Sequence, residues 1–217
     1  MYNLFAIFLF FTGAQKIETD YKELFLNSKY TDVTIKVKDE IFNCHKCILG
    51  ARSPFFAVMM ESDMKEKNTG VVEIDDFEPT TFKEFLLYLY TGNKNHLSMK
   101  NVMELYKMGI MYVMEDLVEC CTEHIEKNIT IENFYDFFLL SQLHNDSKIN
   151  DAAICFFLKN SKAITESEEW LELLSKNPID SNVLIKALAN KISTNTANKS
   201  DTAAGYVTNK KRRVSDF

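Results

Sequence analysis

The sequence predicts an α+β domain followed by an all-helical extension. Two neighbouring apolar segments around residue 40 indicate a strand hairpin, and a third short strand follows around residue 72. From about residue 79 onward, apolar residues recur at helical spacing. The 217 residues carry a net charge of -6, which argues against a basic nucleic-acid-binding face over the whole protein. Neither G-x-G-x-x-G nor G-x-x-x-x-G-K-[ST] occurs, so these nucleotide-binding loops are excluded.

The N-terminal segment, residues 1–19, contains an unbroken apolar run over residues 4–11. The run has the length of a signal-peptide core and is followed by small residues, although no Lys or Arg precedes it. It is shorter than the roughly 20 apolar residues that a transmembrane helix needs. The sequence leaves three interpretations open: a secretion signal, a strand left from a lost upstream domain, and an artefact of where the start of the gene was placed.

The next elements are a short helix and a strand hairpin. Residues 20–27 show a helical pattern, and residues 31–38 alternate strictly between apolar and polar side chains. Residues 41–45 are expected to form the partner strand of the hairpin. A helix is expected to start at Lys46 and to continue to Ala51. The apolar face of the first helix consists of Tyr21, Leu24 and Phe25.

The remaining elements are separated by turn and capping residues. Ser53 is expected to cap a new helix, with Pro54 in its first turn. A charged loop at 61–70 precedes a strand at 71–74, and Pro79 opens a helix that Gly92 ends. Further helices are expected at 102–109, 114–125, 134–140, 152–157, 170–174 and 183–192, with Pro178 ending the fifth of them. Residues 193–217 are expected to form a disordered tail.

These residues resemble the BTB/POZ family. Residues 42–56, FNCHKCILGARSPFF, are similar to the family pattern F-x-x-H-[KR]-x-x-L followed by S-x-x-F. Residues 31–33 (TDV), 72–74 (VEI) and 90–92 (YTG) also match it. Within the family, residues 20–191 resemble the group that contains speckle-type POZ protein and the TD and POZ domain-containing proteins. The resemblance implies a BTB/POZ fold, with a short sheet flanked by helices, over 20–127, and a BACK-like helical extension over 128–192.

The same resemblance implies a homodimer. The helix that carries Tyr21, Leu24 and Phe25 would pack on the partner subunit, and the alternative is docking on its own domain. Asp32 and Lys46 match positions that hold a buried charge pair beside the interface in BTB dimers. The alternative for this pair is a solvent-exposed strand end and helix start.

A cullin-binding site is also implied by the resemblance. Met64-Lys65-Glu66 matches a hydrophobic-x-Glu motif with which BTB adaptors bind a cullin-3-type scaffold. Met60 would contribute to the same edge, while Phe134 and Phe138 would extend the contact from the first helix pair of the extension. The alternatives are a solvated loop for the motif and burial for the aromatic rings.

No metal, cofactor or catalytic site is expected. The five cysteines indicate reduced thiols rather than a disulfide framework. Cys44 and Cys47 form a C-x-x-C, but one falls at a strand end and the other on a helix, so a zinc site completed by Cys120, Cys121 and His124 is rejected. A Cys44–His45 nucleophile pair lacks an orienting third group. The protein is therefore not expected to be an enzyme.

The expected function is that of an adaptor which homodimerises and recruits a cullin-3-class ubiquitin ligase. Proteins of the resembled group carry an N-terminal MATH domain that binds substrate, and residues 1–19 are too few to form one. Two alternatives follow: a module without a MATH domain that pairs with full-length relatives, and a transcriptional co-regulator. Nuclear or cytoplasmic localisation is expected, with secretion as the alternative to it. A basic cluster predicts nuclear import: Lys210, Lys211, Arg212 and Arg213.

Overall fold

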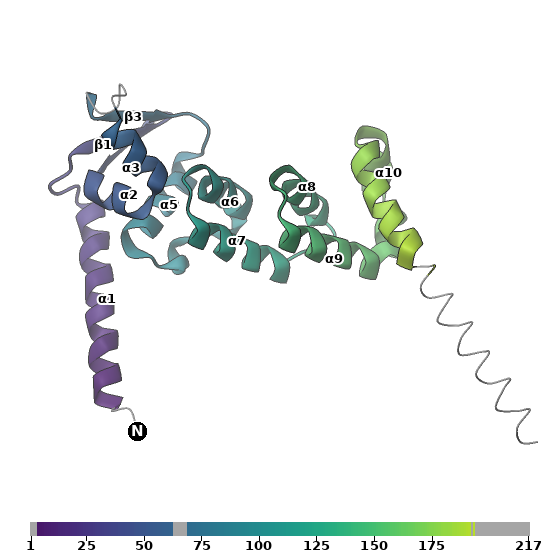
Figure 1. The fold of residues 1–217 in the computed structure, drawn as a ribbon, viewed down its shortest axis with the longest axis horizontal. Helices are drawn as coiled ribbons and strands as arrows, with labels where there is room; N and C mark the ends of the chain where they lie inside the picture. The colour runs from purple at the N-terminus through teal and green to yellow at the C-terminus, as the bar shows by residue number, and fades with distance from the viewer. Residues whose placement is uncertain (1–3, 63–68, 192, 194–217) are drawn as a thin grey trace, which may run out of the picture. The chain divides into compact units, whose positions relative to one another are not determined.

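The computed structural model describes residues 4–62, 69–191 and 193, with the backbone alone for residues 4–12, 14, 99, 169 and 172. The chain divides into two compact units, Met1–Ile125 and Glu126–Phe217 (Figure 1). The first unit is α+β and the second is helical throughout its described part. The predicted fold class is thus confirmed.

A three-stranded sheet forms the β part of the first unit. Strands β1 (Val33–Val37), β2 (Glu40–Cys44) and β3 (Val71–Ile74) lie in the order β2-β1-β3. β1 is antiparallel to β2 and parallel to β3. Alternate residues of β1 are buried, as the strict alternation of the sequence predicts for a half-buried strand: Val33, Ile35 and Val37.

The helices of the first unit begin and end at recognisable capping residues. The Ser53 hydroxyl accepts a hydrogen bond of 3.3 Å from the Phe56 N–H, with Pro54 in the first turn of α3. Gly92 has a φ of +67° and ends α5 in the left-handed conformation that glycine adopts readily. The helices are α1 (Leu4–Leu26), α2 (Lys46–Arg52), α3 (Pro54–Glu61), α5 (Pro79–Thr91), α6 (Val102–Met111) and α7 (Glu115–Lys127), with short 3-10 turns η1 (Lys94–His96) and η2 (Met99–Asn101).

Helix α1 is much longer than the sequence pattern predicted. It begins at Leu4 rather than near residue 20, because the apolar run continues without a break into the amphipathic segment. No proline interrupts these residues. The backbone of the run is helical, so its interpretation as a leftover strand is wrong. Among the described helices, none has the length and apolar character that crossing a membrane requires.

Helix α6 also extends further than expected, since Gly109 lies inside it rather than at its end. Gly109 faces α7 at close range. A Cβ atom at this position would lie 2.8 Å from Cγ2 of Val118 and 3.2 Å from its backbone nitrogen. The glycine therefore permits the close approach of α6 and α7. The chain reverses after α6 through Val113, whose φ of +56° is rare for a β-branched residue.

An aromatic cluster fills the core of the first unit around Tyr112, which is 2% exposed. The Tyr112 ring stacks on Phe56 at 4.9 Å and on Phe85 at 5.0 Å between centroids. Its backbone carbonyl accepts a 2.6 Å hydrogen bond from the Ser53 hydroxyl. The start of α3, the middle of α5 and the end of α6 are held together at this residue.

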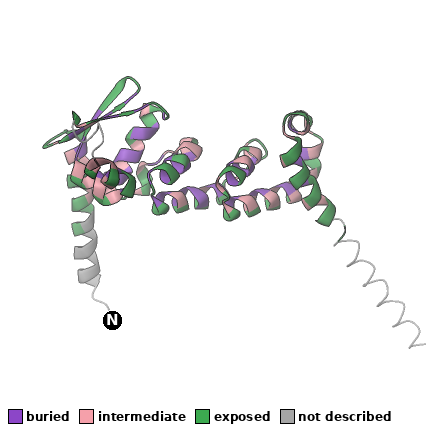
Figure 2. Cartoon of the chain, turned by 45° about the horizontal axis from the view of Figure 1, so that its top comes forward, coloured by how far each residue is buried: buried purple, intermediate pink, exposed green. Residues whose placement is uncertain are grey.

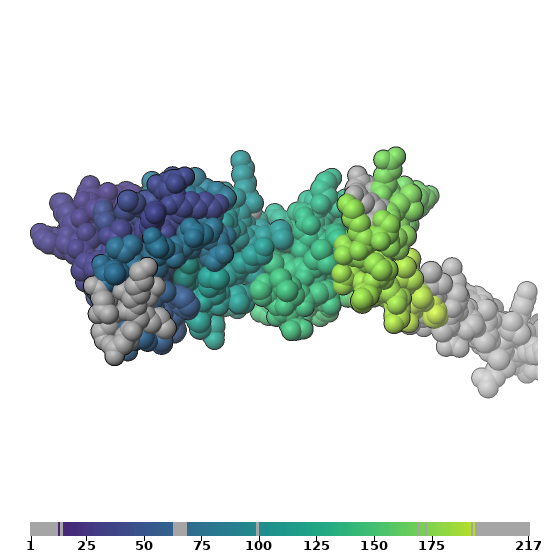
Figure 3. Space-filling view, turned by 90° about the horizontal axis from the view of Figure 1, so that it is seen from above, coloured from purple at the N-terminus to yellow at the C-terminus, as the bar shows by residue number. Residues whose placement is uncertain are grey.

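The second unit contains α8 (Phe134–His144), α9 (Ser147–Thr165) and α10 (Glu168–Lys176), followed by a helical run over residues 178–191. Asp146 and Ser167 cap α9 and α10 through their side chains. Figure 3 shows the green and yellow atoms of these helices packed side by side. The core residues of this unit are Phe134, Phe138, Ala153, Phe157, Ile164, Trp170, Leu173 and Leu184.

Candidate partner-binding surfaces

Helix α1 is anchored to its own unit by one side. The Phe25 ring is 5% exposed and lies 5.0 Å from the Tyr90 ring. Nearer the N-terminus of the helix, Glu18 accepts a 2.6 Å hydrogen bond from the Asn93 side-chain amide. Its carboxylate also lies 3.6 Å from Nε2 of His96. The sequence pattern missed this polar anchor because its members are 75 residues apart in the chain.

A second side of α1 carries apolar residues that its own unit leaves uncovered. Ile17 is 60% exposed and Tyr21 is 43% exposed, while Leu24 is half-buried. Their spacing of four and three residues places them on one helical face, here called the α1 face. The ribbon of α1 is largely green over its described residues in Figure 2, the colour of exposed residues. The helix therefore docks on its own domain through Phe25 and presents the α1 face to its surroundings.

The base of α1 is tied to the sheet through His45, which is 6% exposed. Its Nε2 lies 2.6 Å from the Lys29 carbonyl and its Nδ1 lies 2.6 Å from the Tyr90 hydroxyl. The carbonyl accepts only, so Nε2 carries the proton and Nδ1 accepts from Tyr90 in the neutral ring. The Tyr90 hydroxyl also accepts a 2.9 Å hydrogen bond from the His45 N–H. Every polar group of this network is thereby paired.

Asp32 and Lys46 meet, but through the backbone of Lys46. The Asp32 carboxylate accepts a 2.7 Å hydrogen bond from the Lys46 N–H and so caps the start of α2. In the single chain Asp32 is exposed and Lys46 is half-buried. The predicted burial of this pair beside a dimer interface stays a prediction.

An apolar surface lies at α3 and the turn after α6, and it is called the α3 patch. Val58 is 60% exposed and Phe55 is 37% exposed on α3. The Phe55 ring lies 5.3 Å from that of Tyr112, and the next residue, Val113, is 52% exposed. Met60, on the same helix, is half-buried. Met64 and Glu66 follow α3 directly, and both lie outside the described residues.

A family model for the BTB/POZ domain matches residues 21–129. The chain belongs to the BTB/POZ domain family. Its relatives include TD and POZ domain-containing protein 4 of Mus musculus, 31% identical over 163 residues, which are 75% of this chain and 44% of the relative. TD and POZ domain-containing protein 5 of Mus musculus is 31% identical over 160 residues, 73% of this chain and 47% of the relative. The chain spans less than half the length of these relatives.

The BTB/POZ family is a family of protein-interaction domains, so its surfaces are of more interest than its reactive groups. Burial raises the pKa of the Cys44 thiol to about 12, and it does the same for Cys121. Both thiols therefore stay protonated and unreactive near neutral pH. Among the side chains that the structure describes, no group of three or more His, Cys, Asp or Glu is arranged to hold a metal ion.

The other candidate residues of the BTB/POZ chain lie in the second unit. Phe134 and Phe138 are 5% and 0% exposed, and both belong to the core of that unit. Their rings support the packing of α8, and the Phe138 ring contributes nothing to the surface. The basic cluster lies beyond the described residues: Lys210, Lys211, Arg212 and Arg213.

Proposed function

We propose that the chain is a non-enzymatic adaptor that self-associates through α1 and recruits a cullin-3-class ubiquitin ligase, so that bound proteins are ubiquitinated and degraded. The uncovered apolar face of α1 is the observation that carries this proposal. Ile17 and Tyr21 remain exposed although Phe25 on the same helix is fully docked. An apolar face of this kind at the edge of an interaction domain favours a second copy as its partner, because a two-fold axis lets one face cover its equal.

The α3 patch supports the second half of the proposal. It combines exposed Phe55 and Val58 with a strained residue, Val113, and backbone strain is concentrated at binding sites. The Met64-x-Glu66 motif follows α3 within the sequence and would add an apolar anchor and a carboxylate to the same edge. A direct contribution of Phe134 and Phe138 is not part of this proposal, since their rings are buried in the second unit.

Binding of a purified cullin-3-class scaffold tests the ligase part. We expect a Met64→Ala/Glu66→Ala double variant and a Val58→Asp variant each to lose at least tenfold in affinity, equivalent to about 1.4 kcal/mol. Ile179→Asp serves as the matched control, because Ile179 is an 81% exposed apolar residue of the second unit. Equal affinity of all three variants and the unchanged chain would remove the α3 patch from the proposal.

A second candidate function uses the α1 face alone. The α1 face and the α3 patch consist of different residues, so the chain can pair with a related BTB/POZ protein without binding a ligase itself. It would then dilute the substrate-binding sites of that relative. Co-expression distinguishes the two functions: the adaptor raises ubiquitination of a bound protein with dose, whereas the diluting partner lowers it.

A further inference from the structure

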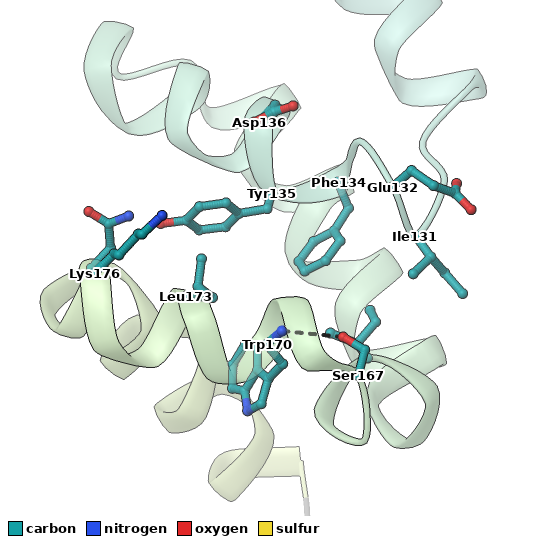
Figure 4. Close-up of a pocket in the computed structure, with 11 residues that line it drawn as sticks. Ile131, Glu132, Phe134, Tyr135, Asp136, Ser167, Trp170, Leu173 and Lys176 are labelled. Carbon is teal, nitrogen blue, oxygen red and sulfur yellow. Dashed lines mark hydrogen bonds between the residues drawn. The ribbon is translucent and has the colours of Figure 1, made fainter.

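A groove with a volume of about 510 Å³ lies in the second unit, between the start of α8 and α10 (Figure 4). Its apolar lining comes from three helices and includes the rings of Phe134 and Trp170 together with Leu173. Ser167, which caps α10, stands at one end, and Lys176 and Asn177 stand at the other. The groove is large enough for two or three side chains of an extended peptide.

The polar groups around this groove favour a basic peptide. Glu132 and Asp136 line it, and both are exposed. Asp180 acts electrostatically on the Tyr135 hydroxyl, which is shielded from solvent and lies near the Asn177 side chain. In Figure 4 the Tyr135 side chain extends across the groove toward Lys176. An apolar floor with carboxylates at its rim suits a segment that combines an aromatic residue with several cations.

We propose that the chain's own C-terminal segment, residues 206–213 (YVTNKKRR), occupies this groove. Tyr206 and Val207 would cover the apolar floor, and the cluster at 210–213 would lie along the carboxylates of Glu132 and Asp136. The groove's rim carries the two carboxylates Glu132 and Asp136 against one cation, Lys176, and the segment carries four positive charges within eight residues. The segment is part of the same polypeptide, and so the pairing needs no other molecule.

The end of the described chain places this segment within reach. The helical run 178–191 belongs to the second unit, where Leu184 is fully buried and Lys191 donates a 2.6 Å hydrogen bond to the Leu158 carbonyl. The stretch from residue 193 to Tyr206 can span roughly 40 Å when extended. A unit of about 70 residues has a radius of gyration of only about 11 Å, so every part of its surface is accessible to the segment. A tether of this length supplies a millimolar effective concentration, at which modest contacts suffice for binding.

In this arrangement the C-terminal segment and the groove cover each other. While residues 210–213 lie in the groove, they are withheld from any receptor for basic peptides, and the groove is closed to other ligands. This inference concerns the second unit and does not depend on the adaptor function proposed for the first.

Competition between the tethered tail and a free peptide tests the proposal. The probe is a fluorescein-labelled peptide of residues 204–217, titrated with the full chain and with the chain truncated after Ser193 while its anisotropy is measured. We expect the truncated chain to bind the peptide at least tenfold more tightly than the full chain. Binding should weaken between 50 mM and 500 mM salt. Trp170 is the single tryptophan of the chain and lines the groove, so its emission should change on binding.

Charge reversal identifies the site. Glu132→Lys/Asp136→Lys in the truncated chain should abolish peptide binding, whereas Asp39→Lys/Asp75→Lys, an equal charge change at exposed residues of the first unit, should leave it unchanged. Replacing residues 210–213 by alanine in the full chain should restore binding of the free peptide. Equal affinities of the full and truncated chains, or binding unaffected by the Glu132 and Asp136 variants, would overturn the proposal. Inhibition that appears only at high concentrations of the full chain would do so as well, because the tail would then come from another copy.

Discussion

The hydroxyl oxygen of Tyr90 lies 2.6 Å from Nδ1 of His45 and 2.9 Å from the backbone nitrogen of the same residue. This pair joins the end of α5 to the point at which β2 passes into α2. Because His45 also bonds the Lys29 carbonyl, the pair fixes the segment that connects α1 to the sheet. The position of α1, and with it of the α1 face, therefore depends on these buried hydrogen bonds.

Tyr90→Phe should destabilise the first unit by about 1–3 kcal/mol, because it leaves two buried polar groups of His45 without their partner. Urea unfolding at pH 7, followed by circular dichroism, measures this difference. Tyr30→Phe is the control, since Tyr30 is 88% exposed and its hydroxyl can be replaced without burying an unpaired group. If both variants unfold at the same urea concentration, the network contributes nothing to stability.

Two glycine-to-alanine substitutions should change the free energy of unfolding in opposite directions. Gly109→Ala is expected to cost about 1–3 kcal/mol, because its Cβ would meet Val118 at 2.8 Å and push α6 from α7. Gly50→Ala, inside α2, places its Cβ 3.6 Å from Cα of Ala57, an ordinary contact distance, and should gain about 0.5–1 kcal/mol from helix propensity. The difference in unfolding free energy between the two variants is the measurement. A gain for both would contradict the close approach at Gly109.

The free energy of unfolding should fall as the pH rises above 9. The ordinary pKa of a thiol here is 9.0, and burial raises the pKa of Cys44 and of Cys121 to about 12. Below pH 9 both thiols are protonated in the folded and the unfolded chain, so their contribution to stability is fully present. Above pH 9 the unfolded chain releases these protons first, which stabilises it relative to the folded chain.

The two thiols together should account for a loss of roughly 2–3 kcal/mol between pH 8 and pH 10. Urea unfolding at the two pH values measures it, and the difference should shrink in a Cys44→Ala/Cys121→Ala variant. Comparing each variant with itself at two pH values separates this effect from the cavity that the substitution creates. Cys47→Ala is the matched control, because Cys47 is exposed.

The α1 face should control self-association. Ile17→Asp/Tyr21→Asp is expected to convert a dimer into a monomer with an unchanged circular dichroism spectrum, because both residues are exposed in the single chain. Light scattering after size exclusion measures the mass. Glu23→Ala, on a different side of the same helix, should leave the mass unchanged. A monomeric unchanged chain, or a double variant that stays dimeric, would show that α1 is not the contact.

The local elements of the BTB/POZ unit were predictable because their signals are short-range. Alternation defined β1, Ser53 and Pro54 defined the start of α3, and Gly92 defined the end of α5. The extent of α1 was not predictable from periodicity, since its first half is apolar all round and shows no face.

Contacts between distant residues explain the other differences. Gly109 looked like a helix end, but its meaning depends on Val118 in the next helix. The Glu18–Asn93 contact and the groove at Trp170 likewise join residues from separate segments of the chain, and no spacing rule connects them. The family resemblance predicted which residues contact partners, but it did not predict their exposure. In the structure Tyr21 is exposed, whereas Phe25 and Phe138 are buried.

The parallel pairing of β1 with β3 has a consequence for the order in which the chain acquires its structure. Thr34 pairs with Val71, so the sheet is complete only after the intervening residues 38–70, which include β2, α2 and α3, have been synthesised. The second unit is built largely from neighbouring helices, whose contacts are local. Local contacts close quickly, whereas a parallel pair must first close a long loop. We therefore expect the C-terminal helices to form in the earlier refolding phase, although the ribosome releases them last.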